Sequence, residues 1–175
     1  MTSNLPKRQS AVNDPEWPAR TSEGEAFTSL VVSVAALGDR ITRAGEDLAA
    51  LGGLSLARWV VLDAACTSPA TVAQLARARG MARQSVQRVA DALVADELAT
   101  FEENPQHRRA KLLVATPAGR AAVLTINAAQ KAWADAVGGA LGATAMTDAN
   151  RAVGLLREAL DAGPDVVRPG DPRDP

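Results

Sequence analysis

The stretch VAQLARARGMARQSVQRVADALV, residues 72–94, has the spacing of two short helices joined by a tight turn. Ala76 is followed four residues later by Gly80, and then by the apolar pair Val86 and Val89. Two helices that cross steeply need a small side chain where their backbones approach, and the turn between them favours glycine because glycine tolerates a positive φ. The stretch therefore predicts a helix-turn-helix.

The second helix of this motif has an apolar face and a polar face. Its apolar residues recur at i, i+3, i+4, i+7 and i+8, as expected for a stripe that faces the core: Val86, Val89, Ala90, Leu93 and Val94. The opposite face carries guanidinium, amide and hydroxyl groups, which recognise base edges and phosphates in duplex DNA. We predict a DNA-reading surface formed by Arg83, Gln84, Ser85, Gln87 and Arg88. An ordinary solvated helix face is the alternative interpretation.

A basic hairpin is predicted directly after this helix. Two strand-like segments, at 99–104 and 110–116, flank a tip with the sequence PQHRR, and Leu112 and Val114 are expected on one face of the second strand. Such a wing can lie along the DNA backbone or in the minor groove, where the negative potential favours arginine. The predicted wing contacts are His107, Arg108, Arg109 and Lys111. A solvated charged turn is the alternative.

A further pattern joins the predicted wing to the next helix, within ARQSVQRVADALVADELATFEENPQHRRAKLLVATPAGRAAV, residues 82–123. Arg108 and Arg109 are paired at the tip, and Thr116 and Gly119 have the spacing Thr-x-x-Gly after the second strand. In these features the chain resembles the MarR family of winged-helix transcriptional regulators. The wing of that family typically reads Asp-Arg-Arg, and its following strand ends in Leu-Thr-x-x-Gly.

Two residues depart from the family pattern. His107 stands where the family has an Asp that braces the wing by pairing with an arginine, so the rigidity and pH response of the wing are expected to differ. Ala82 stands where a Ser or Thr usually caps the recognition helix. The missing cap is expected to cost about 1 kcal/mol of local stability.

The distribution of charge supports DNA binding better than the net charge does. The 175 residues carry 19 Lys and Arg against 20 Asp and Glu, a net charge of −1. No acidic residue occurs between 64 and 90 or between 104 and 134. These two windows contain Arg77, Arg79, Arg83, Arg88, Arg108, Arg109, Lys111, Arg120 and Lys131. Positive charge is therefore gathered in the part of the chain that is predicted to meet DNA.

Residues 23–53 predict a long helix with an unbroken apolar seam at heptad spacing. The seam contains Phe27, Leu30, Val34, Leu37, Ile41, Ala44, Leu48 and Leu51. A seam of this regularity commonly requires a partner helix, although packing on its own domain is the alternative. The residues predicted to form a dimer contact are Phe27, Leu30, Val34, Leu37 and Ile41.

Two more helices are predicted, from Pro117 to about Leu141 and from Thr147 to about Ala162, separated by a bend rich in Gly and Ala. The MarR resemblance implies that they interdigitate with the N-terminal helix in a homodimer. Two recognition helices related by a twofold axis would then meet successive major grooves of a palindromic site.

The expected fold class is mainly α with a small β-hairpin wing. Its predicted parts are a flexible tail at 1–22, a dimerisation helix at 23–53, a winged helix-turn-helix DNA-binding domain at 54–116, C-terminal dimerisation helices at 117–163 and a flexible tail at 164–175.

The sequence argues against catalysis, metal binding and membrane insertion. It has one His, one Cys, no glycine-rich phosphate loop and no metal-ligand spacing, so we expect no enzyme activity, no metal and no cofactor. Cys66 is interpreted as a small buried hydrophobe. Because no long apolar run or signal segment occurs, the chain is expected to be cytoplasmic with no membrane partner.

The resemblance also implies an effector pocket between the dimerisation helices and the winged domain. Arg58 and Trp59 are the candidate ligand residues, as a partner for an aromatic acid and as an apolar face, although Trp59 as a plain core residue is the alternative. The expected function is that of a repressor that binds double-stranded DNA as a homodimer and is released by a small aromatic or phenolic effector. A non-catalytic winged-helix adaptor for protein partners is the alternative.

Overall fold

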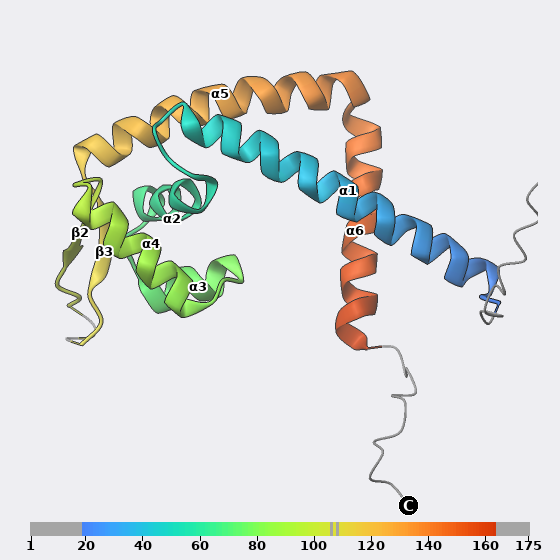
Figure 1. Ribbon diagram of the computed structural model, residues 1–175, viewed down its shortest axis with the longest axis horizontal. Helices are drawn as coiled ribbons and strands as arrows, with labels where there is room; N and C mark the ends of the chain where they lie inside the picture. Colours follow the sequence, from blue (N-terminus) through green and yellow to red (C-terminus); the bar gives the residue numbers. More distant parts are fainter. Residues whose placement is uncertain (1–18, 106, 108, 164–175) are drawn as a thin grey trace, which may run out of the picture. The chain divides into compact units, whose positions relative to one another are not determined.

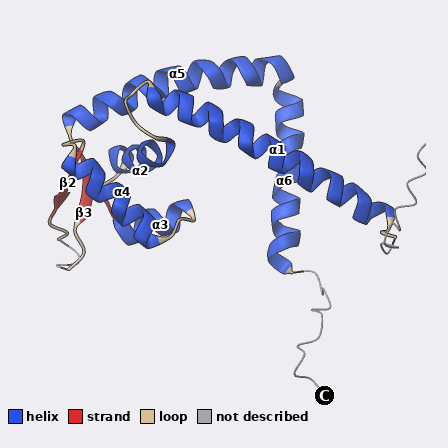
Figure 2. Ribbon diagram, viewed as in Figure 1, coloured by secondary structure: helices blue, strands red, loops and turns tan. Residues whose placement is uncertain are grey.

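A computed structural model describes residues 19–105, 107 and 109–163. These residues form six helices and three short strands (Figure 1): α1 (Ser22–Ala50), α2 (Leu56–Thr67), β1 (Ala70–Thr71), α3 (Val72–Arg79), α4 (Arg83–Ala95), β2 (Ala99–Glu102), β3 (Leu112–Ala115), α5 (Pro117–Leu141) and α6 (Ala143–Ala162). The strands form one small sheet in an otherwise helical chain (Figure 2), which confirms the predicted fold class. Residues 1–18 and 164–175 of the predicted tails, and Arg108 of the predicted wing, lie outside the described residues.

The chain divides into two units, with the boundary between Arg43 and Ala44 inside α1. The N-terminal unit contains the first part of the predicted seam. The large apolar side chains of this part of the seam are 40–55% exposed: Phe27, Leu30, Val34, Leu37 and Ile41. An exposed apolar stripe of this kind is typical of a surface that contacts another apolar surface.

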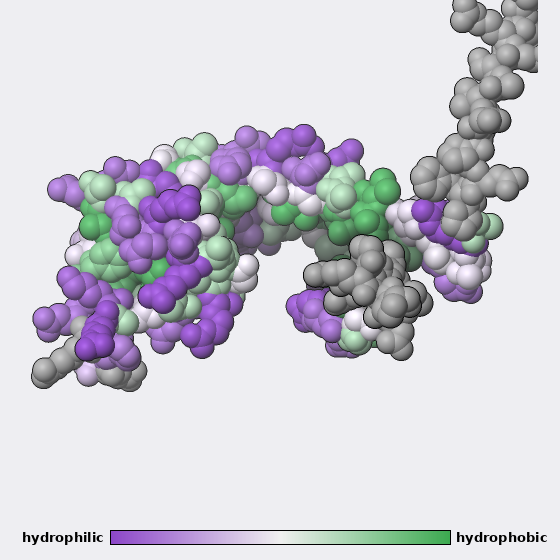
Figure 3. All heavy atoms as spheres, turned by 60° about the horizontal axis from the view of Figure 1, so that its bottom comes forward, coloured by the Kyte–Doolittle hydropathy of each residue, from purple (hydrophilic) through white to green (hydrophobic). Residues whose placement is uncertain are grey.

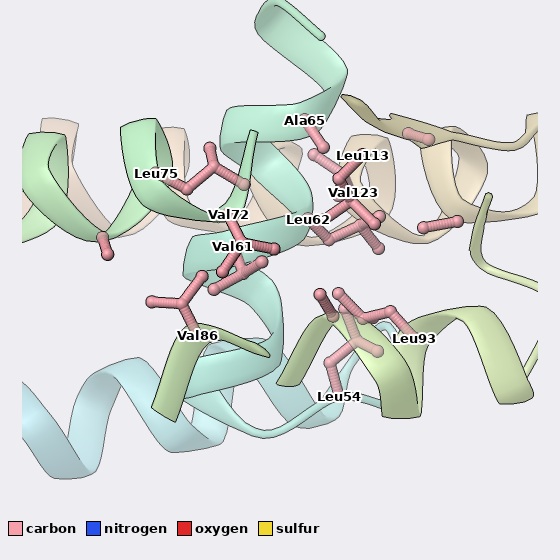
Figure 4. Packing of buried hydrophobic residues seen from close by; sticks show 14 of the residues in the cluster. Leu54, Val61, Leu62, Ala65, Val72, Leu75, Val86, Leu93, Leu113 and Val123 are labelled. Atoms are coloured by element: carbon pink, nitrogen blue, oxygen red, sulfur yellow. The ribbon is translucent and has the colours of Figure 1, made fainter. Parts of the chain in front are cut away.

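The second unit has one hydrophobic core, to which α2, α4, β3 and α5 contribute converging side chains (Figure 4). The largest fully buried members are Val61, Leu62, Val86, Leu93, Leu113 and Ile126. Burying each such side chain contributes about 1.5–3 kcal/mol. The predicted core stripe of α4 is confirmed, because Val86, Ala90 and Leu93 are completely buried while Val89 and Val94 pack on the cluster.

The three strands are antiparallel in the order β1-β3-β2. The hairpin register pairs Ala99 with Ala115 and Phe101 with Leu113. Leu113 and Ala115 face the core, so Leu112 and Val114 share the opposite, half-buried face, as alternation along a strand requires. Strand β1, with only two residues, pairs with β3 and was not predicted, because two residues show no periodicity.

The end of α4 is joined closely to the start of α5. After α4 the chain turns through Glu97, whose φ is 58°, and Leu98 N donates to Leu93 O at 2.9 Å. The Thr116 hydroxyl accepts a hydrogen bond from Gly119 N at 3.1 Å and donates one to Glu97 O at 2.8 Å. One side chain thus caps α5 and also ties it to the turn that ends α4.

The C-terminal helices differ from the prediction at one end. Helix α5 has its predicted bounds, but α6 begins at Ala143 rather than Thr147, and only Gly142, with a φ of 83°, separates the two helices (Figure 1). The predicted bend is present at Gly142, but the predicted start of the last helix was wrong, because the alanines after the bend are strong helix formers and extend α6 toward its N-terminus. Among the described residues, no helix combines enough length with enough apolarity to cross a lipid bilayer.

Candidate nucleic-acid interface

The first helix of the helix-turn-helix is held at both ends as its sequence requires. The Thr71 hydroxyl accepts from Gln74 N at 3.2 Å, and the Gln74 side chain accepts from Thr71 N at 2.8 Å, which completes a capping box. At the other end Gly80 adopts a left-handed conformation with φ 62°, and Met81 N donates to Ala76 O at 2.9 Å. The predicted glycine turn is confirmed, since only glycine adopts this conformation at little cost.

The second helix, α4, presents the predicted reading face to solvent. Arg83, Gln84, Ser85 and Arg88 are exposed, and Gln87 is half-buried. Ala82 occupies the N-cap position and supplies no side-chain hydrogen bond, which confirms the predicted missing cap. The N–H groups of the first turn of α4 therefore lack the side-chain oxygen that caps α3 and α5.

A groove of about 250 Å³ lies between α4, the wing and the start of α3. Its polar and charged lining comes from Arg83 and Gln87 of α4, Arg109 and Lys111 of the wing, and Thr71 at the cap of α3. No carboxylate is among its lining residues. The fold thus brings predicted helix contacts and predicted wing contacts to one hollow, where their positive charges add and attract an anion.

The sequence analysis missed one residue on the predicted reading face. Asp91 is exposed on α4, and Gln87 Nε2 donates a hydrogen bond to its Oδ1 at 2.8 Å. The spacing i,i+4 on a helix, which places a Gln directly beside an Asp, was the signal that would have found this pair.

The wing tip places the remaining predicted contacts in solvent. His107, Arg109 and Lys111 are exposed, and His107 N donates to Asn104 O at 3.1 Å within the turn. Hydrophilic side chains predominate at the wing end of the winged-helix unit (Figure 3).

Helix α2 holds both helices of the motif through ion pairs. Arg58 pairs with Asp96 at the C-cap of α4, and Arg79 at the end of α3 pairs with Asp63 at 3.7 Å. The Arg58 Nε is buried without a hydrogen-bond partner. The ion pair with Asp96 holds the guanidinium of Arg58 against the C-terminal end of α4.

The second candidate ligand residue packs toward α5. Trp59 lies against the core cluster, and its Nε1 donates to Asn127 Oδ1 at 3.3 Å. Asn127 Nδ2 in turn donates to Asp63 Oδ1 at 3.1 Å. Neither Arg58 nor Trp59 lines one of the described cavities.

A cavity of about 260 Å³ lies between α2 and α5, beside this polar chain. Its lining includes Asp63, Cys66, Arg120, Val123 and Asn127. Burial raises the pKa of the Cys66 thiol, and the charge of Asp63 raises this pKa further, while Arg120 acts in the opposite direction. Over 19–105, 107 and 109–163, no group of three or more His, Cys, Asp or Glu side chains is placed to hold a metal ion.

Comparison with known proteins identifies this arrangement. The sequence model of the MarR family matches residues 52–110, which span α2 to the wing tip. The chain belongs to the MarR family. Uncharacterised proteins of Mycobacterium tuberculosis strain H37Rv and of Mycobacterium bovis are 43% identical to it over 96 residues, which make up 55% of this chain and 67% of each relative.

Solved MarR structures share the fold at lower identity. A MarR-family transcription regulator designated SP03579 has a TM-score of 0.73 and 24% identity, over 82% of this chain and 97% of that one. Staphylococcus aureus MarR in complex with salicylate and kanamycin has a TM-score of 0.69 and 16% identity, over 80% and 95% of the two chains. A mutant of E. coli MarR complexed with operator DNA has a TM-score of 0.67 and 16% identity, over 75% and 95%.

Membership of the MarR family confirms the predicted class of function. Members of this family are transcriptional regulators and not enzymes, so the chain has a fold that implies DNA-binding regulation.

Proposed function

We propose that this MarR-family chain is a repressor that binds palindromic double-stranded DNA as a homodimer. Helix α4 enters the major groove, and the wing lies against the neighbouring backbone. The observation that carries this proposal is the groove between α4 and the wing, where Arg83, Arg109 and Lys111 surround one hollow. A phosphate seated there would interact with cations from both DNA-contacting elements.

Exposed side chains on α4 supply the sequence reading. Gln84 and Arg88 lie near the centre of the solvent face, where Arg grips guanine through O6 and N7 and Gln pairs with adenine through N6 and N7. Arg83 and Ser85 are near enough to the start of the helix to contact phosphates. In this arrangement the basic groove provides most of the affinity for DNA, and Gln84 and Arg88 provide most of the preference for particular bases.

The apolar seam on α1 supports the homodimer. Phe27, Leu30, Val34, Leu37 and Ile41 are all at least 40% exposed, and an identical helix offers a matching stripe. Val34→Asp is expected to convert the dimer to a monomer in sedimentation velocity, since it places a charge in the seam. Val32→Asp is the matched control, because Val32 is 66% exposed and lies off the seam. Equal assembly of both variants would argue against this contact.

The cavity between α2 and α5 supports response to an effector. Arg120 offers a cation for a carboxylate or phenolate, and Val123 offers an apolar wall. Trp59 is linked to the cavity through Asn127, while Arg58 is held by Asp96. Salicylate, present in the S. aureus structure, is a suitable probe, and it is expected to lower operator affinity. If neither salicylate nor other phenolic acids change that affinity, the effector proposal falls while DNA binding stands.

Selection of bound sites from a random duplex pool tests the main proposal. The full-length chain is expected to enrich a palindrome with half-sites about one helical turn apart. Affinity for that duplex should fall steeply with salt, because each neutralised phosphate releases counterions. Failure to enrich any duplex, or binding that does not depend on salt, would favour the alternative of a winged-helix adaptor for protein partners.

A further inference from the structure

The side-chain pair Gln87 and Asp91 forms a unit on the reading face of α4. Gln87 Nε2 donates to Asp91 Oδ1 at 2.8 Å, and the two residues are one helical turn apart. Gln87 lines the groove shared with the wing, and Asp91 is exposed. Stepping 100° per residue along α4 places Asp91 close to Gln84 and Arg88, near the centre of the solvent face.

The carboxylate fixes which way the Gln87 amide points. An ionised Asp only accepts hydrogen bonds, so the amide NH₂ of Gln87, and not its oxygen, must face Asp91. A glutamine without such a partner can turn its amide over and present a donor or an acceptor in the same place. Asp91 fixes one of these two orientations. In that orientation Gln87 Nε2 is bonded to Asp91, and Gln87 Oε1 is the amide atom that Asp91 does not bind.

The pair is consequently rich in acceptors. Gln87 Oε1 and the free lone pairs of the Asp91 carboxylate all seek donors. In the major groove, adenine N6 and cytosine N4 donate, whereas guanine presents only the acceptors N7 and O6. A guanine opposite this pair would bring acceptors against acceptors.

We propose that Asp91 is a positioning residue that sets the base preference of Gln87, in favour of adenine or cytosine and against guanine on the strand that Gln87 meets. The inference rests on the proposed function, because it assumes that α4 reads a duplex. An i,i+4 pair of this type also stabilises a helix. The test therefore measures a ratio of affinities for different duplexes, because a change in helix stability does not alter that ratio.

The test uses the full-length chain and the duplex obtained by selection, with each base pair of one half-site varied in turn. Dissociation constants are measured by fluorescence anisotropy for the wild type, Asp91→Asn, Gln87→Ala and the double variant. At one position of the half-site, the wild type should bind the duplex with adenine or cytosine about tenfold more tightly than the duplex with guanine. Asp91→Asn should reduce this ratio below about threefold, because an amide at position 91 can donate as well as accept and no longer fixes Gln87.

Two controls separate positioning from charge and from folding. Glu102→Gln removes one exposed negative charge from β2, and it should strengthen binding to all duplexes alike without changing the ratio. In the Gln87→Ala background, Asp91→Asn should leave the ratio unchanged, because the residue through which Asp91 acts is gone.

Three results would overturn the inference. They are an absence of such a preference in the wild type, an unchanged ratio in Asp91→Asn, and an equal drop of the ratio in the Gln87→Ala background. Each of these can occur while the wild type binds its selected duplex tightly, in which case the proposed function survives. A wild type that binds no duplex overturns both.

Discussion

Gly119 lies so close to Leu98 that a Cβ atom on Gly119 would be 2.0 Å from the Leu98 carbonyl oxygen. The same oxygen accepts a hydrogen bond from Thr116 N at 3.0 Å, so it is fixed in place. This contact joins the first turn of α5 to the residue that leads from α4 into the wing. The Thr-x-x-Gly spacing therefore has a physical cause, since Thr116 caps the helix and Gly119 admits the neighbouring backbone.

Gly119→Ala is expected to lower the free energy of unfolding by about 3 kcal/mol, because a backbone oxygen cannot move aside as a flexible side chain can. Urea denaturation measures the change. Gly138→Ala, in the same helix, is the matched control, since nothing lies within 4 Å of its added Cβ. This control should raise stability by about 0.5–1 kcal/mol. Equal stability of the two variants would contradict the close contact.

Glu97→Gly is expected to stabilise the chain. Glu97 has a φ of 58°, in the left-handed region, and Glu97 N donates to Val94 O at 3.1 Å in a turn that ordinarily contains glycine. Relief of the Cβ strain should raise the free energy of unfolding by about 1 kcal/mol. Ala95→Gly, two residues earlier and inside α4, should instead lower it by about 1 kcal/mol. A loss of stability in Glu97→Gly would show that no strain is present there.

Ala82→Ser is expected to supply the missing N-cap of α4. A serine oxygen at this N-cap can accept a hydrogen bond from the first turn of α4, which should raise the free energy of unfolding by about 1 kcal/mol. Ala92→Ser is the control, because serine at an exposed position inside the same helix gains no cap and slightly lowers helix propensity. Thermal unfolding distinguishes the two, and the idea fails if both variants are destabilised alike.

Local signals in the sequence predicted the framework of this interface. The glycine turn at Gly80 and the apolar stripe of α4 act over a few residues, and each is present where the sequence placed it. The exposed arrangement of Arg83, Gln84 and Arg88 also follows from the helical period alone.

Partners that are distant in sequence were beyond such signals. Arg58 bonds Asp96, which is 38 residues away, and Trp59 bonds Asn127, which is 68 residues away. The periodicity of α2 does not indicate which distant residues its side chains contact. From the sequence, Arg58 and Trp59 therefore remained candidates for binding a ligand. Strand β1 was missed for the same reason, because its pairing with β3 is a property of the folded chain.

The reactivity of Cys66 should respond in opposite directions to its two charged neighbours. Burial is the main reason that its thiol pKa is raised, and Asp63 adds to the effect while Arg120 opposes it. Since the thiolate is the reacting form, Asp63→Asn should lower the pKa and speed alkylation by iodoacetamide at pH 8, and Arg120→Ala should raise the pKa and slow it. The rate of alkylation of each variant, followed by mass spectrometry, checks both predictions. A change in the same direction for both variants would indicate a loss of packing instead.

Arg88 and Arg109 are expected to contribute differently to operator binding. Arg88 is exposed at the centre of the α4 face, so Arg88→Ala should cost about 1–3 kcal/mol of binding free energy and relax the preference at one base pair. Arg109 lines the groove with Arg83 and Lys111, so Arg109→Ala should weaken binding to all sequences alike. It should also reduce the slope of log K against log salt by about 1, because one phosphate contact is lost.

The contrast between the two variants is the informative result. Both remove one positive charge, so a purely electrostatic role would give them the same salt slope and the same uniform loss. Arg157→Ala on α6 is the control for charge alone, since Arg157 is exposed and lies outside the groove. If Arg88→Ala weakens every duplex equally, Arg88 contacts phosphate, and base reading by α4 must then come from Gln84 and from the Gln87 side chain that Asp91 holds.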